Sequence, residues 1–329
     1  EIFSYNRYLI DSINVKEIPN FEVLSELASK KYFLDHQNNL SSIAGNNSKK
    51  SYKEILYLFI SKYFPDLVEI LKGSGLKKDI KGYLDELSDK GFTVIPNLIS
   101  EDKCDQISQT IKNYSAFEAK NKNAFFYGSK NNLQRIYHLL HKLPELNFLL
   151  LLPEVKIVMS ECFQRNTLHD KYYLASWHAN IIPHLGEAQK EHIDAAVPDP
   201  VPPWIIRMNA NFIIQDYKEE NGATLVLPKS HKYCRKPNQN EMKENYVPVI
   251  APKGSVVFWN GHLWHKSGTN KTKENRIALL ACYAASHLKE MCLEEDNLRI
   301  YAMRKIIPPD ELKILLGFDH GIKSGFFDN

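Results

Sequence analysis

His192 and Asp194 are of the residue types that bind transition metals, and their spacing allows them to bind one ion together. Alternate side chains of an extended strand project from the same face, so an imidazole and a carboxylate placed in this way can converge. The HxD pattern alone is weak, because chance pairs are common. A later segment, GHLWHKSGTNKTKENR, contains His262 and His265 and could supply a third ligand.

Two histidines and one carboxylate are the facial ligand set of non-haem iron(II) oxygenases, which leaves three coordination positions open. Two of these positions can take a 2-oxoacid and the third O2. Arg276 stands at the start of the next apolar run, where its guanidinium can form a bidentate bond to the far carboxylate of 2-oxoglutarate. Ser267 can add a hydroxyl donor. One set of residues could therefore serve both a metal and a cosubstrate.

The elements that must position these residues resemble short β-strands. Apolar runs separated by turn residues are typical of a β-sandwich or jelly roll. A helix is expected after Ser100, which is a suitable N-cap, with Glu101 and Asp102 in the first turn. We predict a mainly β fold with helical additions, and its strands are expected in GFTVIPNLIS, YYLASWHANIIP, WIIRMNANFIIQD, ATLVLP, GSVVFWN and RIALLACYAA.

Helical segments are expected to flank this core. Residues 1–87 contain apolar residues at helical spacing and are predicted to form an N-terminal helical extension. The core is expected to occupy residues 88–290. Residues 291–329 are predicted to form a C-terminal helical segment, because Pro308 and Pro309 suit a helix start and Gly317 suits a C-cap.

Composition narrows the class of protein. The 42 basic and 39 acidic residues leave a net charge of +3 without a basic cluster, which argues against a nucleic-acid partner. The five cysteines form no CxxC pair, and we expect a reducing, cytoplasmic location. We find no recognisable signal peptide and no apolar run long enough to span a membrane, so no membrane partner is expected. The oligomeric state is left open.

The segments EHID, ENGATLVLPKSH and WHKSGTNKTKENR resemble successive signatures of the phytanoyl-CoA dioxygenase family. Together they cover roughly residues 88–285, and Thr272 stands where the family has a second serine. The resemblance implies a double-stranded β-helix (jelly roll, cupin-like) fold. It also implies Fe(II), with 2-oxoglutarate and O2 as cosubstrates and with succinate and CO2 as products.

The resemblance also assigns roles to single residues. His192, Asp194 and His265 match the iron ligands, and His265 is preferred to His262 because only His265 has the family's spacing to the serine and arginine. Ser267 and Arg276 match the site of the cosubstrate carboxylate. Candidates for further cosubstrate contacts are Asn180, in a looser match to the family's NxxPG element, and Asn211.

The substrate is predicted to be a small molecule, and the reaction is predicted to be hydroxylation of a C–H bond. Asp194 favours hydroxylation over halogenation, because related halogenases are understood to replace this carboxylate by a small residue. Two alternatives stay open: a non-catalytic jelly-roll binding module and a metal cupin independent of 2-oxoglutarate. Candidate substrate contacts are Gln189, Trp204 and Trp264; surface or hydrogen-bonding roles are expected for His178, His184 and His231.

Overall fold

The computed structural model describes residues 80–164, 172–186, 188–195, 197–238 and 245–285, together with residues 288, 312, 315 and 316. The chain divides into two compact units, Glu1–Ile80 and Lys81–Asn329. The predicted N-terminal extension lies outside the described residues up to residue 79, and the predicted C-terminal segment lies outside them except at residues 312, 315 and 316. Both therefore stay predictions.

The core of the second unit is built from two antiparallel sheets. The larger sheet has seven strands in the order β1-β8-β5-β10-β4-β3-β2, and the smaller has three in the order β7-β6-β9. This arrangement confirms the predicted jelly-roll core. The strands are β1 (Phe92–Ile95), β2 (Phe125–Tyr127), β3 (Leu133–Ile136), β4 (Tyr172–Ile182), β5 (Arg207–Phe212), β6 (Thr224–Val226), β7 (Val247–Pro248), β8 (Val256–Asn260), β9 (His265–Ser267) and β10 (Arg276–Ala285).

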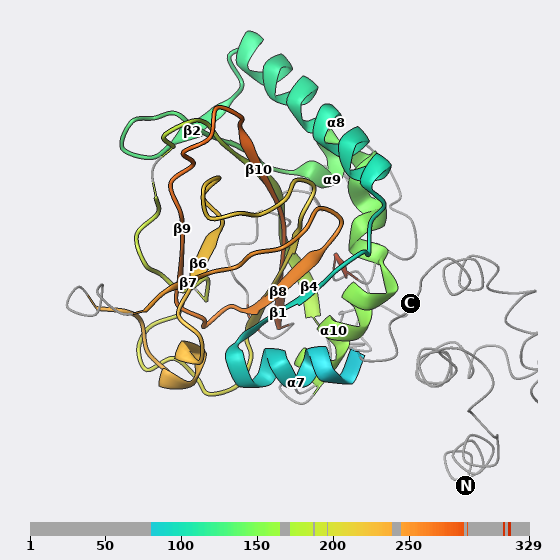
Figure 1. Ribbon diagram of the computed structural model, residues 1–329. Helices are drawn as coiled ribbons and strands as arrows, with labels where there is room; N and C mark the ends of the chain where they lie inside the picture. Colours follow the sequence, from blue (N-terminus) through green and yellow to red (C-terminus); the bar gives the residue numbers. More distant parts are fainter. Residues whose placement is uncertain are drawn as a thin grey trace, which may run out of the picture. The chain divides into compact units, whose positions relative to one another are not determined.

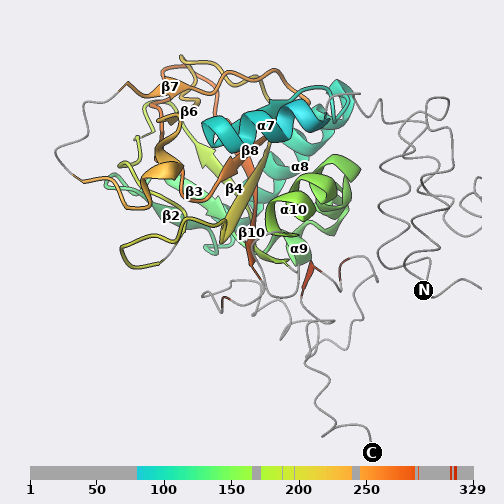
Figure 2. The ribbon, with the colours of Figure 1, turned by 90° about the horizontal axis from the view of Figure 1, so that it is seen from below.

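Helices cover one side of the larger sheet, and the smaller sheet lies toward its other side (Figure 1). The view from below also shows α8, α9 and α10 together beside β4 and β10 (Figure 2). The helices are α7 (Ile80–Lys90), α8 (Glu101–Lys120), α9 (Leu139–Lys142) and α10 (Pro153–Gln164), with 3-10 helices η3 (Pro144–Leu151) and η4 (Ser230–Tyr233). No helix in the described part of the chain has the length and apolar character needed to span a membrane.

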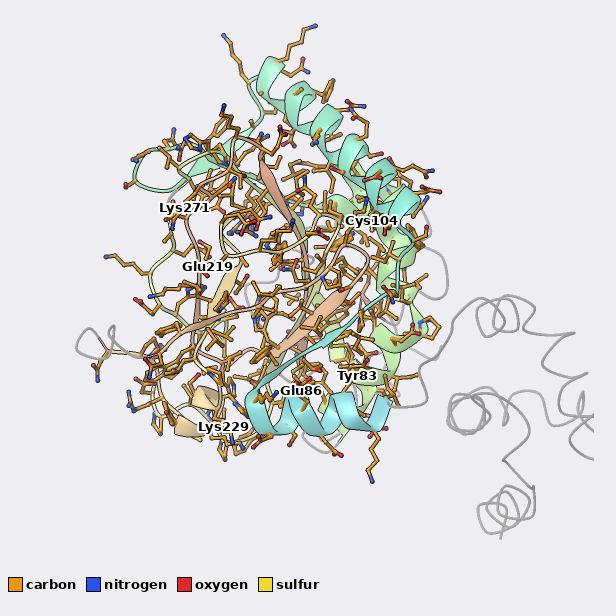
Figure 3. All side chains as sticks on the ribbon, viewed as in Figure 1. Tyr83, Glu86, Cys104, Glu219, Lys229 and Lys271 are labelled. Carbon is orange, nitrogen blue, oxygen red and sulfur yellow. The ribbon has the colours of Figure 1, made fainter. Side chains whose placement is uncertain are left out.

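Helix α8 begins where the sequence predicts. The Ser100 hydroxyl accepts a hydrogen bond from the Lys103 N–H at 3.3 Å, and Glu101 and Asp102 lie in the first turn. Helix α7 is held to the core by ion pairs from Lys229 and Lys232 to Asp89, at 3.1 and 3.0 Å. Figure 3 shows Lys229 beside the C-terminal end of α7.

The long strands β4 and β10 are buried on both faces, and each face has its own partner. On β4, Trp177 points away from the cavity and packs edge-on against Phe212 of β5, with ring centroids 5.5 Å apart. The alternate residues, including His178 and Asn180, line a cavity inside the jelly roll. Because alternate residues of a strand point to opposite faces, one set of β4 side chains packs in the core and the other lines the cavity.

Strands β2 and β3 were not predicted from the sequence. They contain only three and four residues and include polar residues, so neither shows an extended alternating pattern. Their pairing comes from the fold, because β3 lies along β4 with Arg135 opposite Asn180.

Candidate metal and cosubstrate site

The structure brings His192, Asp194 and His265 together, although not on the strand expected for His192 and Asp194. His192 forms an isolated antiparallel bridge with His265, the first residue of β9. Each residue donates its backbone N–H to the other's carbonyl at 3.0 Å. Asp194 lies in a bend, and its N–H donates to the Gly261 carbonyl at 2.9 Å. His192 and Asp194 do not lie on a strand of their own. Backbone hydrogen bonds to residues 261–265 position them.

The side chains of this group are oriented for metal binding. One potential ligand atom from each of the three residues lies within 4.8 Å of the others. Nε2 of His192 lies 3.7 Å from Oδ1 of Asp194, and Nε2 of His265 lies 3.4 Å from Oδ2. The Nδ1 atoms lie 2.8 and 2.9 Å from the carbonyls of Lys190 and Leu263. A protonated Nδ1 that donates to a carbonyl leaves Nε2 as a lone-pair donor, which is the arrangement found around metal-bound histidines.

Two donors from the larger sheet hold the carboxylate. Asn209 of β5 and Trp259 of β8 face each other in the strand register. The Asn209 amide and the Trp259 indole N–H both donate to Oδ2 of Asp194, at 2.7 and 3.1 Å. The role of Asn209 was missed in the sequence, because only the pairing of β5 with β8 places it beside Asp194.

The charge states of the group suit a cation. Burial on its own would raise the pKa of Asp194, but His265, His192 and Arg207 together with the Trp259 N–H lower it below its ordinary value. Burial lowers the pKa of His265, although the Asp194 charge opposes this shift. An ionised carboxylate beside a neutral imidazole is the protonation state that metal binding needs.

Arg276 lines the same cavity as His192, Asp194 and His265. Its side chain is 4% exposed, and its Nη1 donates to the Tyr217 hydroxyl at 2.8 Å. Its Nε is buried and has no hydrogen-bond partner. The Tyr217 hydroxyl also accepts from the Asn211 amide at 3.1 Å. A buried guanidinium with an unsatisfied N–H and only neutral contacts among the described residues is suited to bind an anion.

The other predicted cosubstrate residues share this cavity with Arg276. Ser267, Asn180 and Asn211 all line it, and so does Gln189. The Ser267 hydroxyl accepts the Gln189 backbone N–H at 2.9 Å. Oδ1 of Asn211 is buried without a partner. These residues thus line the same cavity as His192, Asp194 and His265.

Two predicted substrate contacts lie elsewhere. Trp204 is 48% exposed on the surface. Trp264 is fully buried, and its indole N–H donates to the Arg235 carbonyl at 3.0 Å. Neither residue lines the cavity.

The other four histidines singled out in the sequence separate into three groups. His262 is buried outside the metal group, and burial lowers its pKa to about 4. His184 and His231 bond to the carbonyls of Thr272 and Ser88, as expected of hydrogen-bonding residues. His178 is also hydrogen-bonded, 3.3 Å from the Ser176 hydroxyl, but it lies in the cavity wall rather than on the surface.

The cavity has a volume of about 370 Å³ and contains residues that the sequence did not single out. They come from the larger sheet and from the loop after β3: Tyr127, Arg135, Tyr137, His178, Arg207 and Cys282. A residue at an alternate position of a strand faces the cavity only because of the sheet register, and no local motif marks it.

Comparisons with known proteins agree with this geometry. Residues 87–278, more than half of the chain, match the family model described as phytanoyl-CoA dioxygenase. The chain is 30% identical over 163 residues to the dioxygenase af480 of Aspergillus fumigatus, a match that covers 47% of this chain and 51% of that protein. It is 33% identical over 87 residues to the uncharacterized protein Rv1501 of Mycobacterium tuberculosis, covering 26% of this chain and 32% of that one. The chain thus spans about half, or less, of these curated relatives.

Among solved structures, the fold resembles the epimerase SnoN in complex with Fe3+, alpha ketoglutarate and nogalamycin RO. The TM-score is 0.51 at 14% identity, and the match covers 63% of this chain and 84% of SnoN. At this identity the likeness concerns the fold, and it supports the jelly-roll assignment. The resemblance found in the sequence motifs is confirmed by the family model, and the chain belongs to the phytanoyl-CoA dioxygenase family.

Proposed function

We propose that this protein is an Fe(II)- and 2-oxoglutarate-dependent dioxygenase that hydroxylates a C–H bond of a small organic molecule. The observation that carries the proposal is one cavity with two features. His192, Asp194 and His265 meet in it with their potential ligand atoms within 4.8 Å of one another. In the same cavity, the buried Arg276 guanidinium has no anionic partner among the described residues.

His192, Asp194 and His265 would hold the iron. The donor set of two imidazoles and one carboxylate, without a thiolate, suits non-haem iron(II) and leaves positions open for other ligands. When bound, iron and 2-oxoglutarate supply the oxidising chemistry, in which O2 is consumed as 2-oxoglutarate becomes succinate and CO2.

Arg276 would bind the far carboxylate of 2-oxoglutarate. Its Nε is free to donate, and a guanidinium presents parallel N–H groups to a carboxylate. Tyr217 positions this guanidinium from behind the cavity wall. Its oxygen accepts from both Arg276 and Asn211, which ties the guanidinium to β5. Ser267 also lines this cavity.

Asp194 has a further consequence for the type of reaction. Its carboxylate is fixed by Asn209 and Trp259, so it keeps its place among the ligands rather than leaving room for a halide. This favours hydroxylation over halogenation. An intact Arg276 site with its Tyr217 partner also favours an enzyme over a binding module, and over a metal cupin that does not use 2-oxoglutarate.

The test is 2-oxoglutarate turnover by the purified protein under air. Added Fe(II) should give succinate and CO2 in equal amounts, at a low rate without substrate and a higher rate with one. Asp194→Ala and Arg276→Ala should each lose this turnover while remaining folded by circular dichroism. Full turnover in folded Asp194→Ala would overturn the metal assignment, and full turnover in Arg276→Ala would favour the metal cupin.

A further inference from the structure

The cavity has a second polar region beyond the metal ligands and Arg276. Arg135 comes from β3, His178 from β4 and Arg207 from β5, and all three line the cavity. Tyr127 and Tyr137 lie beside Arg135 and line it as well. None of these residues is needed to hold iron or the far carboxylate of 2-oxoglutarate.

The charges of the cavity do not balance without a further anion. Asp194 is the one acidic residue among the described residues that line it, against three arginines. A divalent iron, the Asp194 carboxylate, a doubly charged 2-oxoglutarate and the Arg276 guanidinium together carry no net charge. Arg135 remains as a positive charge in the cavity wall.

Arg135 is held in place by neutral groups. Its Nε donates to Oδ1 of Asn180 at 2.6 Å, and its Nη1 donates to the Tyr137 hydroxyl at 3.2 Å. The guanidinium carbon lies 4.7 Å from the centroid of the Tyr127 ring and 5.5 Å from that of Tyr137. No carboxylate of the described part of the chain contacts it. A fixed, partly buried guanidinium without a counter-charge is preorganised to bind an oxyanion.

His178 contributes no charge to the cavity wall. Burial, and then the positive charge of Arg135, lower its pKa to about 3. The imidazole is therefore neutral near pH 7, and it faces the same space as a neutral hydrogen-bonding group. The positive potential of this wall comes from the arginines.

Aromatic rings extend from Arg135 to the surface. Phe125 is 48% exposed, and its ring lies 5.3 Å from that of Tyr137 and 6.3 Å from that of Tyr127. Such rings offer apolar area next to the guanidinium. The combination suits a ligand with an acid group and an apolar body.

We propose, building on the function proposed above, that the substrate is an organic acid whose anionic group is bound by Arg135, with its apolar body against Tyr127 and Tyr137. Arg135 is then a specificity-determining residue. It selects acids over their neutral counterparts, and Arg276 serves the cosubstrate.

The test measures binding rather than turnover. The full chain is loaded with Co(II) and N-oxalylglycine, an unreactive analogue of 2-oxoglutarate, and titrated in a calorimeter with matched acids and amides: phenylacetate and phenylacetamide, cinnamate and cinnamamide, octanoate and octanamide. Phenyl phosphate is added to distinguish a phosphate from a carboxylate ligand. Acids should bind at least about tenfold more tightly than their amides, as expected for a charge-assisted bidentate contact.

Arg135→Gln should remove this preference and leave the affinity for N-oxalylglycine within about twofold of the native value. Lys130→Gln is the matched control, because Lys130 is exposed, carries the same charge and lies in the loop before β3. It should keep the preference for acids. A panel in which acids bind no better than amides overturns the inference. A preference that survives in Arg135→Gln, or that is lost equally in Lys130→Gln, also overturns it.

The same titrations separate this inference from the function on which it rests. If Arg135→Gln loses N-oxalylglycine as well, Arg135 belongs to the cosubstrate site and the inference is wrong, while the proposed function stands. If the native protein binds neither Co(II) nor N-oxalylglycine, the proposed function itself fails.

Discussion

His192 and His265 exchange two backbone hydrogen bonds of 3.0 Å, so the two imidazoles are brought together by main-chain pairing before any metal binds. Their ring centroids lie 4.3 Å apart. Folding therefore supplies the free energy needed to bring the candidate ligands together.

This pairing predicts that His192→Ala removes the metal site without unfolding the protein, because the backbone bridge does not need the side chain. The melting temperature of the metal-free protein should change by no more than about 2 °C, in keeping with a partly exposed side chain. Calorimetric titration with Co(II) should show no specific binding. His184→Ala, at an exposed histidine, should bind Co(II) as the native protein does. Native-like Co(II) affinity in His192→Ala would show that the ion is held elsewhere.

Trp259→Phe tests the residues that hold Asp194. Phenylalanine keeps an aromatic ring at this position, although a smaller one, and lacks the indole N–H that donates to Oδ2. Removal of such a partner typically lowers metal affinity by about 10- to 100-fold, and we expect a loss in that range. Asn209→Ala should give a similar loss, since its amide donates to the same oxygen. Unchanged Co(II) affinity in both variants would mean that the carboxylate needs neither donor.

Tyr217→Phe tests the residue that positions Arg276. A hydrogen bond to a charged group contributes about 1.5–3 kcal/mol, so the Kd for 2-oxoglutarate should rise by about tenfold or more. Metal affinity should not change, because the hydroxyl contacts Arg276 and Asn211 rather than the metal ligands. Tyr83→Phe, on α7, is the control (Figure 3). An unaltered Kd for 2-oxoglutarate in Tyr217→Phe would remove Tyr217 from the site.

The fold was largely predictable where apolar runs are long. The runs around Tyr172–Ile182 and Arg276–Ala285 form strands as expected, and Ser100 caps its helix. Arg276 could be identified because it stands at a fixed distance from His265 along one segment. The predicted metal and cosubstrate motifs are short segments of sequence, so they can be recognised without knowledge of the fold.

The remainder of the cavity depends on contacts between distant segments. Arg135 meets Asn180 only because β3 pairs with β4. Tyr217 meets Arg276 across a separation of 59 residues. Trp264 directly precedes β9, but its indole is buried and donates to the Arg235 carbonyl rather than lining the cavity.

Stability at acid pH should depend on His262. Its folded pKa is lowered to about 4, mainly by burial and then by His231, from an ordinary value of 6.5. The unfolded chain therefore binds more protons than the folded chain between these values, so stability is full above pH 6.5 and falls as the pH drops toward 4. The slope for one such group approaches about 1.4 kcal/mol per pH unit.

His262→Gln should make this fall shallower by up to that slope. The check is urea unfolding at pH 7, 6, 5 and 4, with the exposed His184→Gln as control. Curves for His262→Gln that run parallel to those of the native protein would contradict the assignment.

The most direct test of the proposed function is an anaerobic titration of the metal-free protein with Fe(II) and then 2-oxoglutarate, followed by visible absorption spectroscopy. A 2-oxoacid bound to Fe(II) through two atoms gives a weak metal-to-ligand charge-transfer band. We predict that the native protein develops this band at stoichiometric Fe(II), that Arg276→Ala needs far more 2-oxoglutarate to reach it, and that Asp194→Ala does not develop it. Absence of the band in folded native protein, with both additions in excess, would contradict the proposed function.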